Sequence, residues 1–355
     1  MEFLANNNNV RILGRSLMID HIRYLNYSSS AVEFIFTGKD LWATLWTNGH
    51  QGDEIYKAWV AVFVDDELTP SKRFSLDVEE KDYMLYHSNQ EKTVKIRLVK
   101  ISEEAFGKVG IISFKTDTQH PIIPTKEKQR KMEFIGDSLT CGYGIEGTFE
   151  VDVFNTAQEN CWTAYAARCA RAFDADYHLV AWSGIGIVSA WVEETVDEPL
   201  NDWLMPMLYQ YTDASLCKDL NMQKEDWEVW NHSHFVPDII VINLGTNDAS
   251  YVRNIPERIT EFEKTYYQFL EYVREHNRHS TILCTLGVMG QDLCPVIHSQ
   301  VERFAKDKKD TNIFFMEFDV QLESDGIGSD WHPSETTHCK MAEKLTNKIK
   351  ELKKW

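Results

Sequence analysis

The stretch "EFIGDSLTCGYGI", residues 133–145, decides the fold of the second half of this chain. The apolar run "MEFI", residues 132–135, is typical of a short buried β-strand. Gly136 and Asp137 follow this run, then Ser138, and then two more glycines. Ser138 is therefore expected at the end of a strand, in a glycine-rich turn. From this stretch alone the serine is either a nucleophile or merely a hydroxyl in a turn.

The chain beyond residue 125 repeats the order strand, loop, helix. Strands are predicted over 131–138, 177–184, 237–248, 281–289 and 312–319, and helices over 161–173, 256–277 and 334–354. This alternation predicts a parallel sheet with helices on both faces. Ligands of such sheets bind at the carboxyl ends of the strands.

The first 125 residues show strands and no convincing helical pattern. Segments rich in β-branched and aromatic residues lie at 31–38, 56–67 and 92–102, with turn signals at 47–54 and 87–92. Short strands and frequent turns predict an antiparallel β-sandwich or jelly roll. We expect a β-sandwich (jelly-roll) domain over 1–125 and a catalytic α/β domain over 126–355, joined in the proline-containing segment 117–131.

Composition excludes several classes of partner. With 37 basic and 55 acidic residues the net charge is −18, which disfavours nucleic acid and anionic membranes. No run approaches the roughly 20 apolar residues of a membrane span. The start of the chain lacks the apolar core of a signal peptide, and the seven scattered cysteines suit a reducing compartment, so a cytoplasmic location is expected unless a leader was trimmed. The oligomeric state cannot be read from these features.

Chemically suggestive residues fall at four of the predicted strand ends. Ser138 follows the first strand, Gly184 follows "HLVAWS", and Asn247 follows "IIVINLGT". Asp330 and His332, in "GSDWHPS", come just before the last helix. Each motif is weak by itself, since glycine-rich turns and helix caps contain the same residues. Four in this order, each at a strand end, indicate one site.

The blocks "GDSL", "SGIG", "GTND" and "DWH" resemble those of the SGNH (GDSL-type) hydrolases. Together with "MPMLYQYT" and the looser N-terminal matches "LGRS", "VEFIFTG" and "FVDDE", the chain resembles carbohydrate esterase family 2. The resemblance implies a three-layer α/β/α SGNH domain behind an N-terminal β-sandwich. It also implies the nucleophile Ser138, the base His332 with its acid Asp330, and an oxyanion hole formed by Ser138, Gly184 and Asn247.

The chemistry of these residue types agrees with that resemblance. A serine hydroxyl becomes a strong nucleophile when an imidazole such as His332 accepts its proton. Asp330 can orient the ring if the segment is extended, because residues i and i+2 then share a face. The spacing departs from the wider superfamily, where the acid stands three residues before the histidine, the position of Ser329. Asp325, or a backbone carbonyl, is the alternative partner of the ring.

Other polar residues near these motifs receive structural interpretations. His338 is expected to be a packing or surface residue of the last helix, and Asp137 and Asp248 to be hydrogen-bonding residues of loops. The pair His232 and His234 lacks further ligands at metal spacing, so neither a metal nor another cofactor is expected.

Aromatic residues are the candidates for substrate contact. The segment between Gly184 and Asn247 is rich in tryptophan and tyrosine, most of which we expect in the core. One or two at the rim would stack on sugar faces. We name Trp331, Trp182 and Trp203 as candidates.

The sequence thus predicts a serine esterase that removes acetyl groups, through an acetyl-enzyme, from oligosaccharides of xylan or mannan type. The carbohydrate substrate follows from the family resemblance rather than from the four blocks. Two alternatives stay open: an SGNH lipid or thioester hydrolase, and a carbohydrate-binding protein without catalysis.

Overall fold

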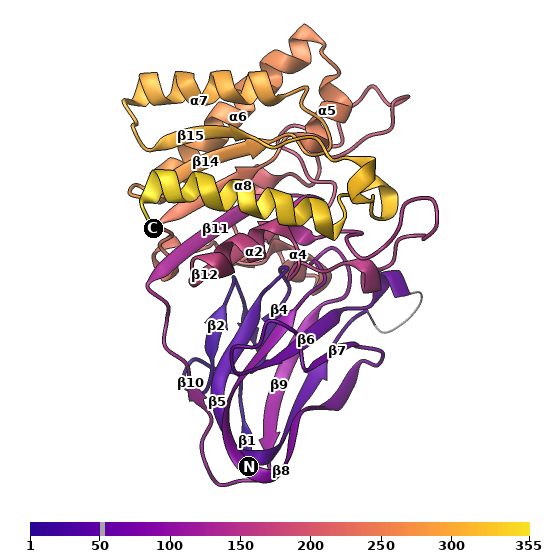
Figure 1. Ribbon diagram of the computed structural model, residues 1–355, viewed down its shortest axis with the longest axis vertical. Helices are drawn as coiled ribbons and strands as arrows, with labels where there is room; N and C mark the ends of the chain where they lie inside the picture. The colour runs from indigo at the N-terminus through magenta and orange to yellow at the C-terminus, as the bar shows by residue number, and fades with distance from the viewer. Residues whose placement is uncertain (50–53) are drawn as a thin grey trace.

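The computed structural model describes residues 1–49 and 54–355. They form two β-sheets, one with antiparallel and one with parallel strands (Figure 1). The N-terminal strands lie at one end of the molecule, and the later strands and the long helices lie at the other. The predicted turn at 47–54 includes residues 50–53, which lie outside the described residues.

The N-terminal sheet is antiparallel, as predicted, and strongly curled. Its strands are β1 (Glu2–Phe3), β2 (Arg11–Leu13), β3 (Met18–Ile19), β4 (Ile22–Leu25), β5 (Ala31–Trp46), β6 (Trp59–Val64), β7 (Lys72–Ser75), β8 (Glu80–Lys100), β9 (Val109–Thr116) and β10 (Ile123–Pro124). The order is β3-β4-β9-β5-β8-β6-β7, with β1 on β9 and both β2 and β10 on β5. Alternate residues such as Phe34, Phe36, Ile96 and Leu98 face its core.

The predicted turn at 87–92 is wrong, because β8 runs through it as one strand. Both halves of β8 pair with β5, where Asp40 is opposite His87 and Gly38 is opposite Lys92. Four residues, 88–91, therefore stand opposite Lys39 alone, which is an irregularity in the pairing of one strand rather than a turn between two strands. Polar residues that are usual in turns are equally tolerated in such an exposed segment.

The second sheet is parallel, as predicted, and has helices on both faces. Its strands are β11 (Arg130–Gly136), β12 (Ala175–Ala181), β13 (Ile239–Asn243), β14 (Thr281–Leu286) and β15 (Ile313–Glu317), in the order β12-β11-β13-β14-β15. The helices are α1 (Ser138–Cys141), α2 (Tyr165–Ala172), α3 (Met205–Leu208), α4 (Ala214–Asp219), α5 (Thr246–Val252), α6 (Pro256–His276), α7 (Cys294–Lys308) and α8 (Glu335–Lys353).

Alternation along each strand assigns the helices to the two faces. In β11, Phe134 packs in the cluster that contains α2 and α8, whereas Ile135 packs in the cluster that contains α6 and α7. The helix α7 was not among the predicted elements. Its buried residues Ile297, Val301 and Phe304 nevertheless follow helical spacing.

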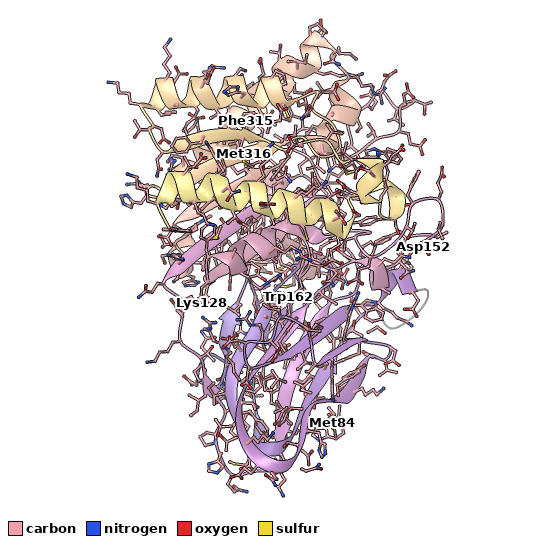
Figure 2. All side chains as sticks on the ribbon, in the orientation of Figure 1. Met84, Lys128, Asp152, Trp162, Phe315 and Met316 are labelled. Carbon is pink, nitrogen blue, oxygen red and sulfur yellow. The ribbon has the colours of Figure 1, made fainter. Side chains whose placement is uncertain are left out.

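The two sheets are joined by a continuous core. Phe63 and Ile101 of the N-terminal half belong to the same buried cluster as Met132 and Leu345 of the second half. Trp162, labelled at this junction in Figure 2, packs its ring 4.1 Å from that of Phe63. The N-terminal half therefore packs directly against the second half of the chain. Among the described residues, no helix has the length and apolarity needed to cross a membrane.

Candidate active site

The site begins where neighbouring strands of the parallel sheet end together. Gly136 of β11 lies opposite Ala181 of β12 and Asn243 of β13. The strand order reverses at β11, since β12 lies on one side and β13 on the other. Ligands of open α/β sheets bind at such a switch point. Ser138, Gly184 and Asn247 all follow these strand ends within four residues.

Ser138 opens the short helix α1 and contacts His332. Asp137 caps this helix by accepting the N–H of Leu139 at 3.1 Å. The Ser138 hydroxyl lies 2.8 Å from Nε2 of His332, and only 6% of the serine is exposed. The structure therefore brings together the two residues that the sequence proposed as nucleophile and base.

The ring of His332 is oriented by a main-chain carbonyl, which differs from the predicted Asp330 carboxylate. Nδ1 lies 3.0 Å from the backbone oxygen of Asp330. Asp330 (φ 51°) and Trp331 (φ 64°) both take left-handed conformations, so the segment is a tight turn and not extended. Side chains at i and i+2 then no longer share a face. The carboxylate accepts instead the hydroxyl of Tyr143 at 2.9 Å.

The other candidates for an acid are bound elsewhere. Asp325 accepts two hydrogen bonds of 2.7 Å from Lys340. Ser329, at the position where the wider superfamily has its acid, donates its hydroxyl to Gln158 at 2.8 Å. His338 is fully buried and accepts the N–H of Tyr165, so of the two expected roles, packing and surface, it has the packing role.

The hydrogen bonds of His332 define its protonation. A carbonyl oxygen can only accept, so Nδ1 carries the proton and Nε2 is left as the acceptor for the Ser138 hydroxyl. Burial lowers the pKa of His332 to about 4. At neutral pH the ring is therefore the neutral base that serine activation needs.

Gly184 and Asn247 border the same site. Gly184 has a φ of +79°, which favours glycine, and nothing lies within 4 Å of where a Cβ would stand. The amide nitrogen of Asn247 donates to the backbone oxygen of Ile185 at 2.8 Å and lies 3.5 Å from Asp137. Asn247 thus lies between the residue that follows Gly184 and the residue that precedes Ser138.

Two buried aspartates hold the loops around this site, as predicted. The Asp248 carboxylate accepts the backbone N–H groups of Ile187, Val188 and Ser189 at 2.7–3.2 Å. Burial raises the pKa of Asp248 to about 6 and that of Asp137 to about 7. Their bonds are to backbone and to Asn247, which is a structural role.

Aromatic side chains surround the site to different degrees. Trp331 is 44% exposed, with its ring edge-on to Phe149. Trp182 and Trp203 are half-buried and pack on one another with ring centroids 5.3 Å apart. Trp191 is 56% exposed and donates its backbone N–H to the Gly184 oxygen at 2.9 Å. The sequence did not single out Trp191, because the segment between Gly184 and Asn247 contains several other tryptophans and tyrosines.

A second residue that sequence reasoning missed is Tyr143. Its ring lies 4.5 Å from that of His332 and stacks on Phe154 at 3.6 Å. The signal was present, because Tyr143 lies five residues after Ser138 in the same glycine-rich turn. Its hydrogen bond to Asp330 could not be inferred, because the two residues are far apart in the sequence.

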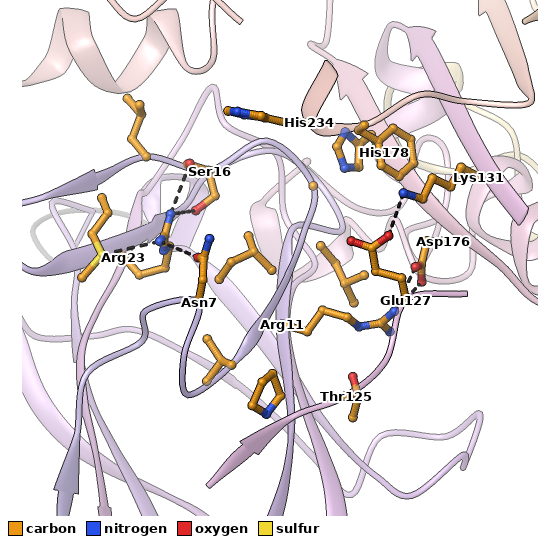
Figure 3. A pocket seen from close by; sticks show the side chains of 18 of the residues that line it. Asn7, Arg11, Ser16, Arg23, Thr125, Glu127, Lys131, Asp176, His178 and His234 are labelled. Carbon is orange, nitrogen blue, oxygen red and sulfur yellow. Dashed lines mark hydrogen bonds and ion pairs between the residues drawn. The ribbon is translucent and has the colours of Figure 1, made fainter. Parts of the chain in front are cut away.

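Two further features do not include Ser138 or His332. A cavity of about 650 Å³ opens at the amino ends of the strands, lined by Arg11, Arg23, Lys131 and His178 among others (Figure 3). At the end of α1, side-chain atoms of Glu103, Cys141 and Glu159 that could bind a metal lie within 4.8 Å of one another, and all three residues are fully buried. The pair His232 and His234 belongs to no such group among the described residues.

Comparison with known proteins identifies the class of protein to which this fold and site belong. Residues 132–345 match the family model described as GDSL-like Lipase/Acylhydrolase, and residues 12–125 match the model described as Carbohydrate esterase 2 N-terminal. The chain belongs to the GDSL-like hydrolases. Within them it belongs to the family 2 carbohydrate esterases.

Individual relatives agree with this assignment. A family two carbohydrate esterase from Clostridium thermocellum, solved in complex with cellohexaose, is 31% identical, with coverage of 96% of this chain and 98% of that one and a TM-score of 0.83. An acetylxylan esterase / glucomannan deacetylase from Cellvibrio japonicus is 27% identical over 99% of this chain and 91% of its own length. The cellulase/esterase CelE of Acetivibrio thermocellus is 32% identical over 93% of this chain, which spans 38% of that protein.

Proposed function

We propose that the protein is a serine esterase that removes O-acetyl groups from acetylated plant-polysaccharide oligosaccharides. The observation that carries the proposal is the 2.8 Å contact between the Ser138 hydroxyl and a neutral His332 at the switch point of the parallel sheet. Membership in the family 2 carbohydrate esterases supports the acetyl group and the saccharide. No cofactor is required for this chemistry.

The reaction proceeds in two halves. Ser138 Oγ attacks the acetyl carbonyl while His332 Nε2 takes its proton, and the N–H groups of Ser138 and Gly184 hold the resulting oxyanion. Asn247 supplies the third donor with the amide hydrogen that makes only the long 3.5 Å contact with Asp137, while its other hydrogen stays on the Ile185 oxygen. As the tetrahedral intermediate collapses, the sugar oxygen leaves with the proton from His332, and Ser138 keeps the acetyl group. Water, deprotonated by His332, then attacks the acetyl-enzyme. Acetate leaves as the Oγ–carbonyl bond breaks and His332 returns the proton to Ser138 Oγ.

The group that orients the base is not the carboxylate of a Ser-His-Asp triad. His332 is held in the correct tautomer by the backbone oxygen of Asp330, and we propose that Ser138 and His332 work as a dyad with that carbonyl as the orienting group. The Asp330 carboxylate accepts the Tyr143 hydroxyl instead of the His332 ring.

The substrate class rests on the relatives and on the aromatic surface. The acetylxylan esterase / glucomannan deacetylase supports xylan- or mannan-type oligosaccharides. Trp331 and Trp191, both well exposed, offer flat faces for sugar rings, and Trp182 with Trp203 stays a proposed contact. We further propose that residues 1–125 form a jelly-roll domain and residues 126–355 the catalytic domain. The unpaired cysteines support a reducing, cytoplasmic location.

The decisive experiment follows acetate release by NMR from acetylated xylan and mannan oligosaccharides. The proposal predicts deacetylation by the wild-type protein and none above background by Ser138→Ala. Deacetylation confined to long-chain acyl esters would favour a lipid hydrolase instead. Oligosaccharide binding without any acetate release would favour the non-catalytic binding protein.

A further inference from the structure

We propose that Glu103, from the N-terminal half of the chain, is a positioning residue for the esterase site, where its carboxylate fixes the loop of Gly184 and the helix that begins at Ser138. The inference rests on the proposed function. It assigns to the N-terminal sheet a direct part in the geometry of the catalytic centre. Glu103 lies in the connection between β8 and β9, far from Ser138 in sequence.

One oxygen of Glu103 makes two contacts with the second half of the chain. Oε2 accepts the backbone N–H of Ser183 at 2.8 Å and the thiol of Cys141 at 3.8 Å. Ser183 immediately precedes Gly184, and Cys141 is the last residue of α1, which Ser138 opens. A single acceptor therefore links the turn of the nucleophile to the loop of the oxyanion glycine.

Glu103 is itself held firmly in place. The residue is fully buried, and so is Lys100 at the end of β8. The Lys100 ammonium donates to the backbone oxygens of Asn26 at 2.8 Å, Ser102 at 3.1 Å and Glu103. These bonds fix the turn that follows β8, so the carboxylate reaches the Gly184 loop from a rigid base.

Neighbouring acids in this buried group do not share that role. Neither carboxylate oxygen of Glu104 has a hydrogen-bond partner, and burial raises the pKa of Glu104 and of Glu159 well above the ordinary value. Glu103 differs because the backbone N–H that it accepts belongs to Ser183, in the loop of Gly184. Its ability to accept that bond, rather than its charge, is what the geometry uses.

An oxyanion hole accelerates a reaction when its donors are already aimed before the charge develops. The Gly184 N–H is one peptide away from the Ser183 N–H that Glu103 fixes. Loss of the carboxylate should therefore lower kcat and leave KM nearly unchanged, since the contact matters in the transition state.

The experiment compares three replacements of Glu103 in the full chain. Hydrolysis of 4-nitrophenyl acetate gives kcat and KM, and the rate of covalent inactivation by a fluorophosphonate reports the oxyanion hole separately, at temperatures below each variant's unfolding midpoint. Glu103→Ala should lower kcat and the inactivation rate about 10- to 100-fold, below the loss of a whole oxyanion donor. Glu103→Gln, whose amide oxygen still accepts from Ser183, should stay within about threefold, and the shorter Glu103→Asp should fall about tenfold.

Glu104→Gln is the matched control, since Glu104 is adjacent and equally buried but contacts neither catalytic loop; it should stay within about twofold of wild type. Wild-type kcat in Glu103→Ala, an equal loss in Glu104→Gln, or retention by Asp with loss by Gln would each overturn the inference. Should Glu103→Ala fail to fold, the order of Gln above Asp decides. A wild-type protein that hydrolyses no acetyl ester would refute the proposed function instead, so the two failures remain distinguishable.

Discussion

Replacement of Asp330 by asparagine separates the dyad from a triad. Asparagine tolerates the left-handed backbone at this position, where φ is 51°, and its amide oxygen can still accept from Tyr143. The backbone carbonyl that holds His332 Nδ1 is unchanged. The variant therefore removes one exposed charge near the ring and little else.

The size of the effect follows from that geometry. An exposed charge interaction contributes about 0.2–1 kcal/mol, which at 1.36 kcal/mol per decade corresponds to a loss of about 1.4- to 5-fold in kcat. Where an aspartate carboxylate itself holds Nδ1, its replacement by asparagine costs about 10⁴-fold, because the wrong tautomer is stabilised.

The assay is the steady-state rate of acetate release near pH 7.5, with circular dichroism to confirm folding. Tyr143→Phe serves as a control, because it removes the partner of the same carboxylate and should give a loss of similar size. A loss above about 100-fold in Asp330→Asn would refute the carbonyl-oriented dyad and restore the carboxylate as the acid.

Three further outcomes are expected. Burial lowers the pKa of His332 to about 4, so the ring stays neutral to lower pH than an ordinary histidine. The value of kcat/KM should therefore fall only below about pH 5, and a midpoint near pH 6.5 would contradict this. Activity on 4-nitrophenyl esters should fall at least about tenfold from acetyl to butyryl, since an acyl pocket built for acetyl would be overpacked by each added methylene. A constant or rising kcat/KM would favour a lipid hydrolase. Prolonged EDTA treatment should leave activity unchanged, and a loss reversed by added metal would assign an ion to the group Glu103, Cys141 and Glu159.

The sequence predicted those parts of the site that depend on local patterns. Apolar runs followed by glycine, asparagine or serine located the strand ends, and the parallel topology then brought Ser138, Gly184 and Asn247 to one edge of the sheet. His332 was predicted by the same reasoning, from its place before the last helix. These residues lie close in sequence to the strands that position them, so the sequence pattern was enough to predict where they lie in the fold.

His332 is oriented by a backbone carbonyl, the alternative that the sequence left open, and not by the favoured Asp330 carboxylate. Whether Asp330 presents its carboxylate or its carbonyl to His332 depends on two backbone angles, those of Asp330 and Trp331. Neither residue type signals a left-handed turn strongly enough to overrule an extended reading. The segment also bonds to Gly144, through the N–H of Ser329, and sequence reasoning did not include that contact.

Glu103 was not predicted because its partners are far away in sequence. Nothing in "KISEEAFG", residues 100–107, distinguishes it from exposed acidic residues. Its burial arises only when the N-terminal sheet packs against the Gly184 loop, as the contact with Ser183 shows. Long-range contacts of this kind are decided by the assembled fold rather than by periodicity.

The central claim is that Ser138, activated by His332, hydrolyses acetyl esters of a saccharide. Its most direct test is time-resolved NMR of acetate and of the sugar acetyl signals, with acetylated xylan and mannan oligosaccharides and equal amounts of wild type and Ser138→Ala. We predict that the wild type releases stoichiometric acetate and that Ser138→Ala, folded to the same extent, is slower by at least about a thousandfold. Equal acetate release by both proteins, or none by the wild type, would contradict the account.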